Sequence, residues 1–186
     1  VTTLLFNNLE LVDSRFRHWD ENEKGQDYGI DYWHLSLAKL NGKFTDVSVV
    51  GDSINAIIKE LQLEEQSGFE LKSVTGNALV DGNEITVDEI NLKSSSTDIH
   101  GKLSFKYKQY ADLIDFVNKV SIESVLTKSK LSAKDLSYFV PVLEHLDDSI
   151  LLHGEVTGTV SRLKLKECEF EYGENTLFRG SISIDG

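Results

Sequence analysis

The chain has 186 residues, with 19 Lys and Arg against 31 Asp and Glu, which gives a formal net charge of −12 at pH 7. This length fits one domain or one section of a larger repetitive structure. A net charge this negative opposes association with the phosphate backbone of nucleic acids. We therefore expect no nucleic-acid partner. The single cysteine, Cys168, excludes an intrachain disulfide framework. The longest apolar stretch, 138–143, is far shorter than the ~20 residues of a membrane-spanning helix.

Most of the chain alternates apolar and polar residues with a period of two, which is the pattern of half-buried β-strands. Residues 4–11 begin the pattern, and residues 33–38 continue it with an apolar side chain at every odd position. From 74 to 80 the alternation is very regular. It returns over 99–107 and again from 150 to the end of the chain.

A tight hairpin turn is predicted at Asp81-Gly82-Asn83, because Asp-Gly between alternating runs favours a turn with positive φ. The apolar phase of the next strand slips by one residue between Val87 and Ile90. An extra residue in one strand causes such a slip, so we predict a β-bulge near Glu89.

Two short helices are predicted to interrupt the strands. Residues 110–118 carry apolar side chains at spacings of three and four. A second helix, over 133–146, starts after Ser132, and Asp135 three residues later completes the pattern of a capping box. Pro141 should bend or divide this helix. We expect the segment to cover one face of the sheet.

A degenerate internal repeat covers approximately 67–107 and 149–186. Val74-Thr75-Gly76 recurs as Val156-Thr157-Gly158, and residues 99–103 are echoed by residues 178–182. A strand–turn–strand unit used twice indicates an elongating architecture. The predicted fold is therefore mainly β: an extended, curved antiparallel sheet of about ten to twelve strands, for which the family resemblance given next implies an open groove. Since the chain opens with Val1 and contains no Met, we expect it to be a section of a longer protein.

Three segments carry a family resemblance: 67–76 (SGFELKSVTG), 94–103 (SSSTDIHGKL) and 130–139 (KLSAKDLSYF), the last followed by Pro141. Together and in this order they resemble the AsmA-like superfamily, in particular the TamB-type (translocation and assembly module) proteins of Bacteroidota. The resemblance extends over nearly the whole chain.

This resemblance implies a long curved β-structure that spans the periplasm, with a hydrophobic groove on its inner face. It implies anchoring in the inner membrane by an N-terminal helix that is not in this chain. The implied partner of other parts of the protein is an outer-membrane barrel of the Omp85 type. The implied role is outer-membrane biogenesis, through phospholipid transport between the two membranes, assistance in outer-membrane protein assembly, or both.

A lipid tail that crosses water needs a continuous apolar surface, since each exposed CH₂ group costs ~0.8 kcal/mol. A curled sheet with one apolar face supplies such a surface, although the same alternation also builds an ordinary packed core. Both possibilities remain open from the sequence. The apolar positions predicted to line a groove for phospholipid acyl chains are Val74, Ala78, Val80, Ile85, Val87, Ile99, Leu103, Phe105, Ile150, Leu152, Val156, Val160, Leu163, Leu165, Phe170, Ile182 and Ile184.

The sequence contains no catalytic signature. Its five histidines lack the spacing of a zinc site, and Cys168 has no neighbouring His or Cys to activate it. Residues 20–25 have a faint likeness to a calcium loop, but Lys24 stands where an oxygen ligand belongs. We expect no enzymatic activity, no metal and no cofactor. The alternative function is a surface or secreted β-repeat module with a closed core, which binds a protein or glycan through its polar face.

Overall fold

The computed structural model describes residues 2–172 and 176–185, without the side chains of 142, 170–172, 184 and 185. It is a single antiparallel sheet of ten strands whose spatial order is their chain order. Strands make up 65% of the structure, and the sheet does not close into a barrel. Within the described residues, the first strand pairs only with the second and the last only with the ninth. The mainly β, open antiparallel fold predicted from the alternation is confirmed.

The strands are long, from 9 to 15 residues. Their bounds are β1 (Thr3–Arg17), β2 (Ser36–Val50), β3 (Ser53–Glu65), β4 (Glu70–Asp81), β5 (Glu84–Ser94), β6 (Asp98–Lys106), β7 (Ser121–Ser132), β8 (Ser149–Thr159), β9 (Arg162–Tyr172) and β10 (Thr176–Asp185).

Both predicted helical segments are present, each divided into a 3₁₀ and an α part. The first consists of η1 (Tyr110–Asp115) and α1 (Phe116–Lys119). The second consists of α2 (Ala133–Ser137) and η2 (Pro141–Leu143). Pro141 stands at the first position of η2, where its missing N–H is not needed, so it divides the segment as expected.

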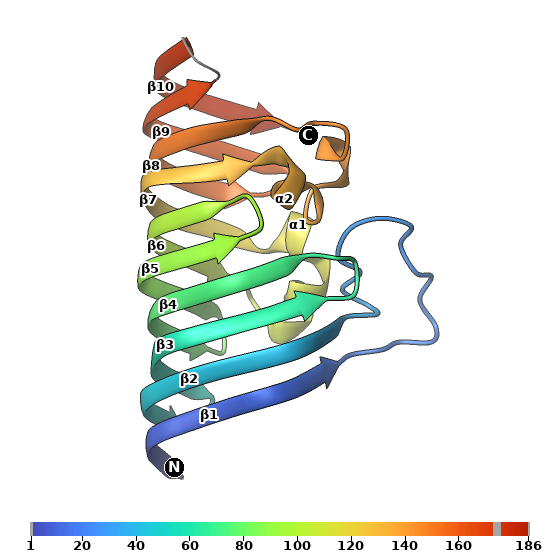
Figure 1. Cartoon of the computed structure of the whole chain (residues 1–186), viewed down its shortest axis with the longest axis vertical. Helices are drawn as coiled ribbons and strands as arrows, with labels where there is room; N and C mark the ends of the chain where they lie inside the picture. Colours follow the sequence, from blue (N-terminus) through green and yellow to red (C-terminus); the bar gives the residue numbers. More distant parts are fainter. Residues whose placement is uncertain (1, 173–175, 186) are drawn as a thin grey trace.

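The strands bend sharply along one line across the sheet, which we call the bend line, and the sheet is thereby curled into a trough (Figure 1). Strands β5, β7 and β9 each carry a non-glycine residue with positive φ on this line, whereas β4, β6, β8 and β10 each carry a glycine. Register shifts accompany these residues, as expected of β-bulges. The bulge predicted near Glu89 is confirmed by its φ of 52°. In chain order the bend line comprises Gly76, Glu89, Gly101, Lys128, Gly154, Glu167 and Gly180.

Close backbone approach explains the glycines of β4, β6 and β8 on the bend line. At Gly101 φ is +125°, and an added Cβ would collide with the carbonyl oxygen of Val125 on the next strand. At Gly154 φ is +142°, and a Cβ would lie 2.7 Å from the Cα of Cys168. Only glycine combines this backbone conformation with the absence of a side chain.

Three longer connections lie on the open side of the trough, opposite the bend line (Figure 1). Two of them lie at the same ends of the strands: 18–35, between β1 and β2, and 133–148, between β7 and β8. The third, 107–120, between β6 and β7, lies at the opposite ends of the strands. The open side therefore receives inserted segments from both walls of the trough.

Two local predictions are wrong. The strand expected over 33–38 begins only at Ser36, because the carboxylate of Asp31 accepts hydrogen bonds from the amides of Trp33 and His34 and holds a turn there. The capping box at Ser132 does not form. The Asp135 carboxylate instead accepts hydrogen bonds from Ser94 Oγ at 2.5 Å and the Ser96 amide at 2.7 Å, which ties α2 to the turn between β5 and β6.

Strand β7 is not predicted by the alternation. Two of its positions on the apolar face hold Ser124 and Ser129, so the run Ile122–Leu131 lacks the apolar period. Its pairing with β6 and β8, which both alternate clearly, makes it a strand all the same.

Candidate functional site

The concave face of the trough carries most of the apolar side chains. Phe105 of β6 points to this face, since its ring lies 5.3 Å from that of Phe116 in α1, on the open side. Two buried groups form the core of the face. The first is centred on Ile58, Val74 and Ile90, and the second on Leu126, Leu152 and Cys168.

Cross-strand pairing brings the predicted groove residues together in rows. One row is Val80, Ile85 and Phe105; another is Ala78, Val87 and Leu103; a third is Val156, Leu165 and Ile182. These side chains and those of Ile99, Ile150 and Leu163 are half-buried. An apolar surface of this kind is covered only in part by the protein's own side chains.

Some predicted groove residues have a different environment. Val74 is only 5% exposed and Leu152 only 2%, so both belong to the packed core and present little surface to a guest. Val160 lies in the turn after β8 and is half-buried. Phe170 lies in β9 and Ile184 in β10, and the side chains of both are outside the described part of the structure.

A polar gap interrupts the concave face at Ser124, which sequence reasoning missed. Ser124 lies opposite Val156 and is 4% exposed. Its Oγ has no hydrogen-bond partner among the described residues. A small side chain at this point leaves room between larger neighbours, and its buried hydroxyl disfavours close apolar packing.

An aromatic contact joins the inserted segments above β6. The ring of Tyr32, from the connection 18–35, stacks on Phe116 of α1 at 6.0 Å, and Phe116 in turn lies against Phe105. The Tyr32 hydroxyl is buried without a partner in the described part of the chain. Burial, together with the charge of Glu65, raises the pKa of Tyr32 to about 12, so the phenol is neutral at physiological pH.

A second contact joins the connection 18–35 to the segment around α2. The amide of Ile30 donates to the carbonyl of Tyr138 at 2.8 Å, and the hydroxyls of Tyr28 and Ser137 lie 2.6 Å apart. The Tyr28 and Tyr138 rings stack at 6.2 Å, and Phe69 packs edge-on against Tyr138 at 5.7 Å. We call the connections 18–35, 107–120 and 133–148 together the cover.

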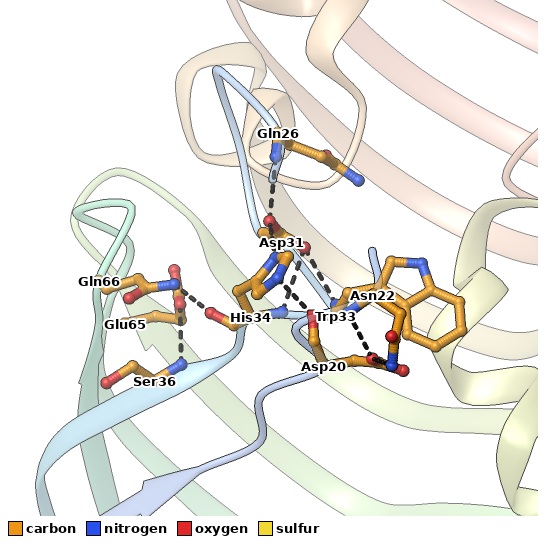
Figure 2. Close-up of polar contacts among 9 residues, drawn as sticks. All are labelled: Asp20, Asn22, Gln26, Asp31, Trp33, His34, Ser36, Glu65 and Gln66. Atoms are coloured by element: carbon orange, nitrogen blue, oxygen red, sulfur yellow. Dashed lines mark hydrogen bonds and ion pairs between the residues drawn. The ribbon is translucent and has the colours of Figure 1, made fainter. Parts of the chain in front are cut away.

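A buried histidine–carboxylate pair shapes the connection 18–35 (Figure 2). Asp31 Oδ2 lies 2.7 Å from Nδ1 of His34 and accepts a hydrogen bond from the amide of Gln26 at 3.0 Å. The other ring nitrogen, Nε2, lies 2.8 Å from the carbonyl oxygen of Asp20. The carbonyl of His34 accepts a hydrogen bond from the Gln66 side chain, which links the segment to the β3–β4 turn. We call these contacts the His34 clasp.

The charge state of the clasp follows from its partners. A carbonyl oxygen and a carboxylate both only accept, so the ring satisfies both when each nitrogen carries a proton. The hydrogen bond with Asp31 is the main cause that raises the pKa of His34, against the effect of burial. Burial opposes ionisation of Asp31, but its hydrogen bonds with Gln26, His34 and Trp33 outweigh this and lower its pKa. Both shifts favour the ion pair between His34 and Asp31.

A polar cavity of about 420 Å³ borders the clasp, with Trp19, Tyr28, His34 and Gln66 in its wall. Sequence reasoning missed this arrangement, although the Asp31-x-x-His34 spacing is the signal of a side-chain-capped turn. Elsewhere, Cys168 is buried, and its Sγ lies 3.0 Å from the carbonyl of Gly180. No group of three or more His, Cys, Asp or Glu side chains is placed to hold a metal within the residues that the structure describes.

Comparison with family models, with curated proteins and with solved structures found no match for this chain. No helix in the described ranges, 2–172 and 176–185, is long and apolar enough to cross a membrane. The class of protein that the geometry defines is an open, trough-shaped antiparallel β-sheet with an apolar concave face.

Proposed function

We propose that this chain is a non-enzymatic periplasmic section of a bridge-like protein for outer-membrane biogenesis, whose concave face shelters phospholipid acyl chains between the inner and outer membranes. The proposal includes an inner-membrane anchor and an Omp85-type barrel partner, both acting through other parts of the protein. It also includes assistance in outer-membrane protein assembly as a use of the same face.

One observation carries the proposal: apolar rows continue from strand to strand along the concave face while their side chains remain half-exposed. The row of Val156, Leu165 and Ile182 leads directly to β10, at the end of the described sheet. An acyl chain that lies along such rows is removed from water together with the side chains that it covers. This burial favours binding by ~25 cal/mol per Å² of apolar area. The benefit recurs at each apolar position along the rows, on both sides of the polar gap at Ser124.

The test is photocrosslinking at Leu103 on the concave face, with Lys102 on the opposite face as the matched control. Lys102 is exposed and lies 3.1 Å from Asp88. A photoreactive residue at 103, but not at 102, should capture radiolabelled phospholipid from vesicles and from cells. Leu103→Asp or Val156→Asp should reduce capture at a second concave position, Phe105, while the protein is still secreted. Equal capture from both faces, or capture only from 102, would refute the proposal.

A second candidate is favoured by the cover. Because Tyr32 stacks on Phe116 above Phe105, the middle of the concave face is shielded, as in a closed-core module that binds a protein or glycan through its outer surface. The same crosslinker separates the two functions. A closed core excludes lipid from position 105 in the intact chain and yields no lipid adduct there.

A further inference from the structure

The polar cavity beside the His34 clasp is separate from the apolar rows of the concave face. Its volume of about 420 Å³ lies within the range of ~300–1,000 Å³ that is typical of small-molecule sites. Its lining residues all belong to the connection 18–35 or to the turn between β3 and β4. The side chains large enough or polar enough to contact a ligand include Trp19, Gln26, Asp27, Tyr28, Gln66 and Ser67.

The clasp holds the walls of this cavity together. The Asp31 carboxylate binds the amide of Gln26 and the ring of His34. The Gln66 side chain donates to the carbonyl of His34 and so ties the β3–β4 turn to the same point. Gly25 contributes space beside the pair, since a Cβ there would lie 3.5 Å from Asp31 Oδ2 and 3.9 Å from His34 Nδ1. Walls that are tied by hydrogen bonds before a ligand arrives reduce the entropic cost of binding it.

Several polar groups of the wall have no partner within the described part of the chain. The side chains of Gln26 and Asp27 make no hydrogen bond or ion pair there, and both residues are exposed. The Gln26 side chain extends away from the clasp (Figure 2). The Ser67 hydroxyl oxygen is buried and is likewise without a partner among the described residues. Buried polar groups without partners are rare in proteins, so this hydroxyl points to a ligand that forms hydrogen bonds.

The chemistry of the wall favours a neutral ligand that both donates and accepts hydrogen bonds. None of the lining residues in the described structure is Lys or Arg, and His34 is paired with Asp31, so the wall offers no unpaired cation to a phosphate or carboxylate. An apolar ligand would displace water from Gln26 and Asp27 without replacing its hydrogen bonds. A saccharide avoids both problems, because its hydroxyls pair with amides and carboxylates while its C–H groups pack on an aromatic ring.

Trp19 provides the aromatic part of the site. The Arg17 guanidinium lies over its ring at 4.4 Å, and the His34 ring contacts it in an edge-to-face arrangement with 4.5 Å between the ring centroids. These two contacts fix the indole in place. Trp19 nevertheless remains 48% exposed, so a large part of its surface is open to a ligand.

We propose that this cavity binds one neutral saccharide unit of a glycan. The sugar hydroxyls pair with the side chains of Gln26, Asp27 and Gln66, and the C–H groups of the sugar pack against the exposed part of Trp19. This inference goes beyond the sheltering of acyl chains and does not depend on it, since the cavity shares no described lining residue with the rows that contain Leu103 and Val156.

The first test is an NMR titration of the isotope-labelled chain with D-glucose, D-galactose, D-mannose and N-acetyl-D-glucosamine at millimolar concentrations. At least one sugar should shift the Trp19 indole signal saturably, and the backbone amides of 25–28 and 66–67 should shift with it. Tetramethylammonium and inorganic phosphate are the comparison probes for a cationic and an anionic ligand. The proposal is overturned if no sugar gives a saturable shift at these residues, or if only one of the two ions does.

The second test removes the unpartnered carboxylate. Asp27→Ala should raise the dissociation constant of the bound sugar about ten-fold, because a hydrogen bond to a charged group is lost. Asp147→Ala is the matched control, since Asp147 is also exposed but lies in the connection 133–148, outside the cavity wall. Equal sugar affinity of the two variants would overturn the assigned site.

Two further measurements separate the possible failures. Both variants should unfold at the urea concentration of the wild type, because neither side chain makes a contact that the fold needs. Neither variant should alter the photocrosslinking result at Leu103, whichever result that is. Sugar binding and acyl-chain binding are therefore tested independently.

Discussion

Single residues on the bend line decide the shape of this protein. From β4 to β10, glycines on even strands and bulges on odd strands act at the same point of neighbouring strands, so the local changes of direction add up across this part of the sheet. Gly101 and Gly154 face a neighbouring backbone without room for a Cβ. These positions hold the two walls of the trough at their observed angle.

Gly101→Ala should therefore destabilise the fold by about 2–4 kcal/mol, since alanine is strained at positive φ and its Cβ would collide with the Val125 carbonyl. Urea unfolding followed by circular dichroism measures the change. Gly25→Ala is the control, because its Cβ would meet only ordinary contacts of 3.5 Å or more and its φ is not in the strained region. Equal effects of the two substitutions would contradict the assigned role of Gly101.

At the scale of elements, the connection 18–35 is ordered by polar contacts more than by a helix or strand of its own. The His34 clasp fixes its path, and Tyr28, Ile30 and Tyr32 then reach the segments around α2 and α1. This connection therefore joins the other two parts of the cover to each other.

The clasp should make the stability of the cover depend on pH. The pKa of His34 is raised from its ordinary value of 6.5 by folding, so its contribution is fully present below about pH 6.5 and is lost as pH rises through the folded pKa. The pKa of Asp31 is lowered from 3.8, so its contribution is present above that value and is lost as pH falls through the folded pKa. The clasp is strongest between these limits.

The pH titration of the His34 ring by NMR should give a pKa above 6.5, and Asp31→Asn should lower it. The difference in unfolding free energy between the wild type and His34→Gln should shrink as pH rises above the raised pKa. A His34 pKa at or below 6.5 contradicts the charge state assigned to the clasp.

For the whole molecule, the strand order means that each strand depends only on its neighbours in sequence. No described pairing joins β1 to β10, so stability is transmitted from strand to strand, as in repeat proteins. Both core groups lie in the interior strands, around Ile58 and Ile90 and around Leu126 and Leu152. The edge strands lack such support on one side.

Native-state hydrogen exchange should therefore show a gradient of protection. Amides of β4–β8 should be the most protected, and those of β1 and β10 should exchange fastest when the protein is dilute. Uniform protection of all strands would indicate a single closed cooperative unit and contradict this description of the sheet.

Much of the fold could be predicted from the alternation of side chains, since period-two patterning reports directly which residues share a face. The bulge at Glu89, the turn between β4 and β5 and the division of the second helical segment by Pro141 are local and were predictable. The positive φ expected in that turn is wrong, since none of Asp81, Gly82 and Asn83 has one. The pairing of Asp135 with Ser94 was not, because these residues are 41 positions apart and meet only after β5, β6 and β7 have paired.

The amino-acid sequence by itself determined the strand class, most of the apolar face and the bulge at Glu89, because each follows from the steric and hydration preferences of neighbouring residues. The tertiary structure decided which apolar side chains became core and which stayed half-exposed. It also decided that the Asp31–His34 pair holds the connection 18–35 against the segment around α2. Those outcomes depend on the angle between the two walls of the trough and on contacts between distant segments, which no local pattern specifies.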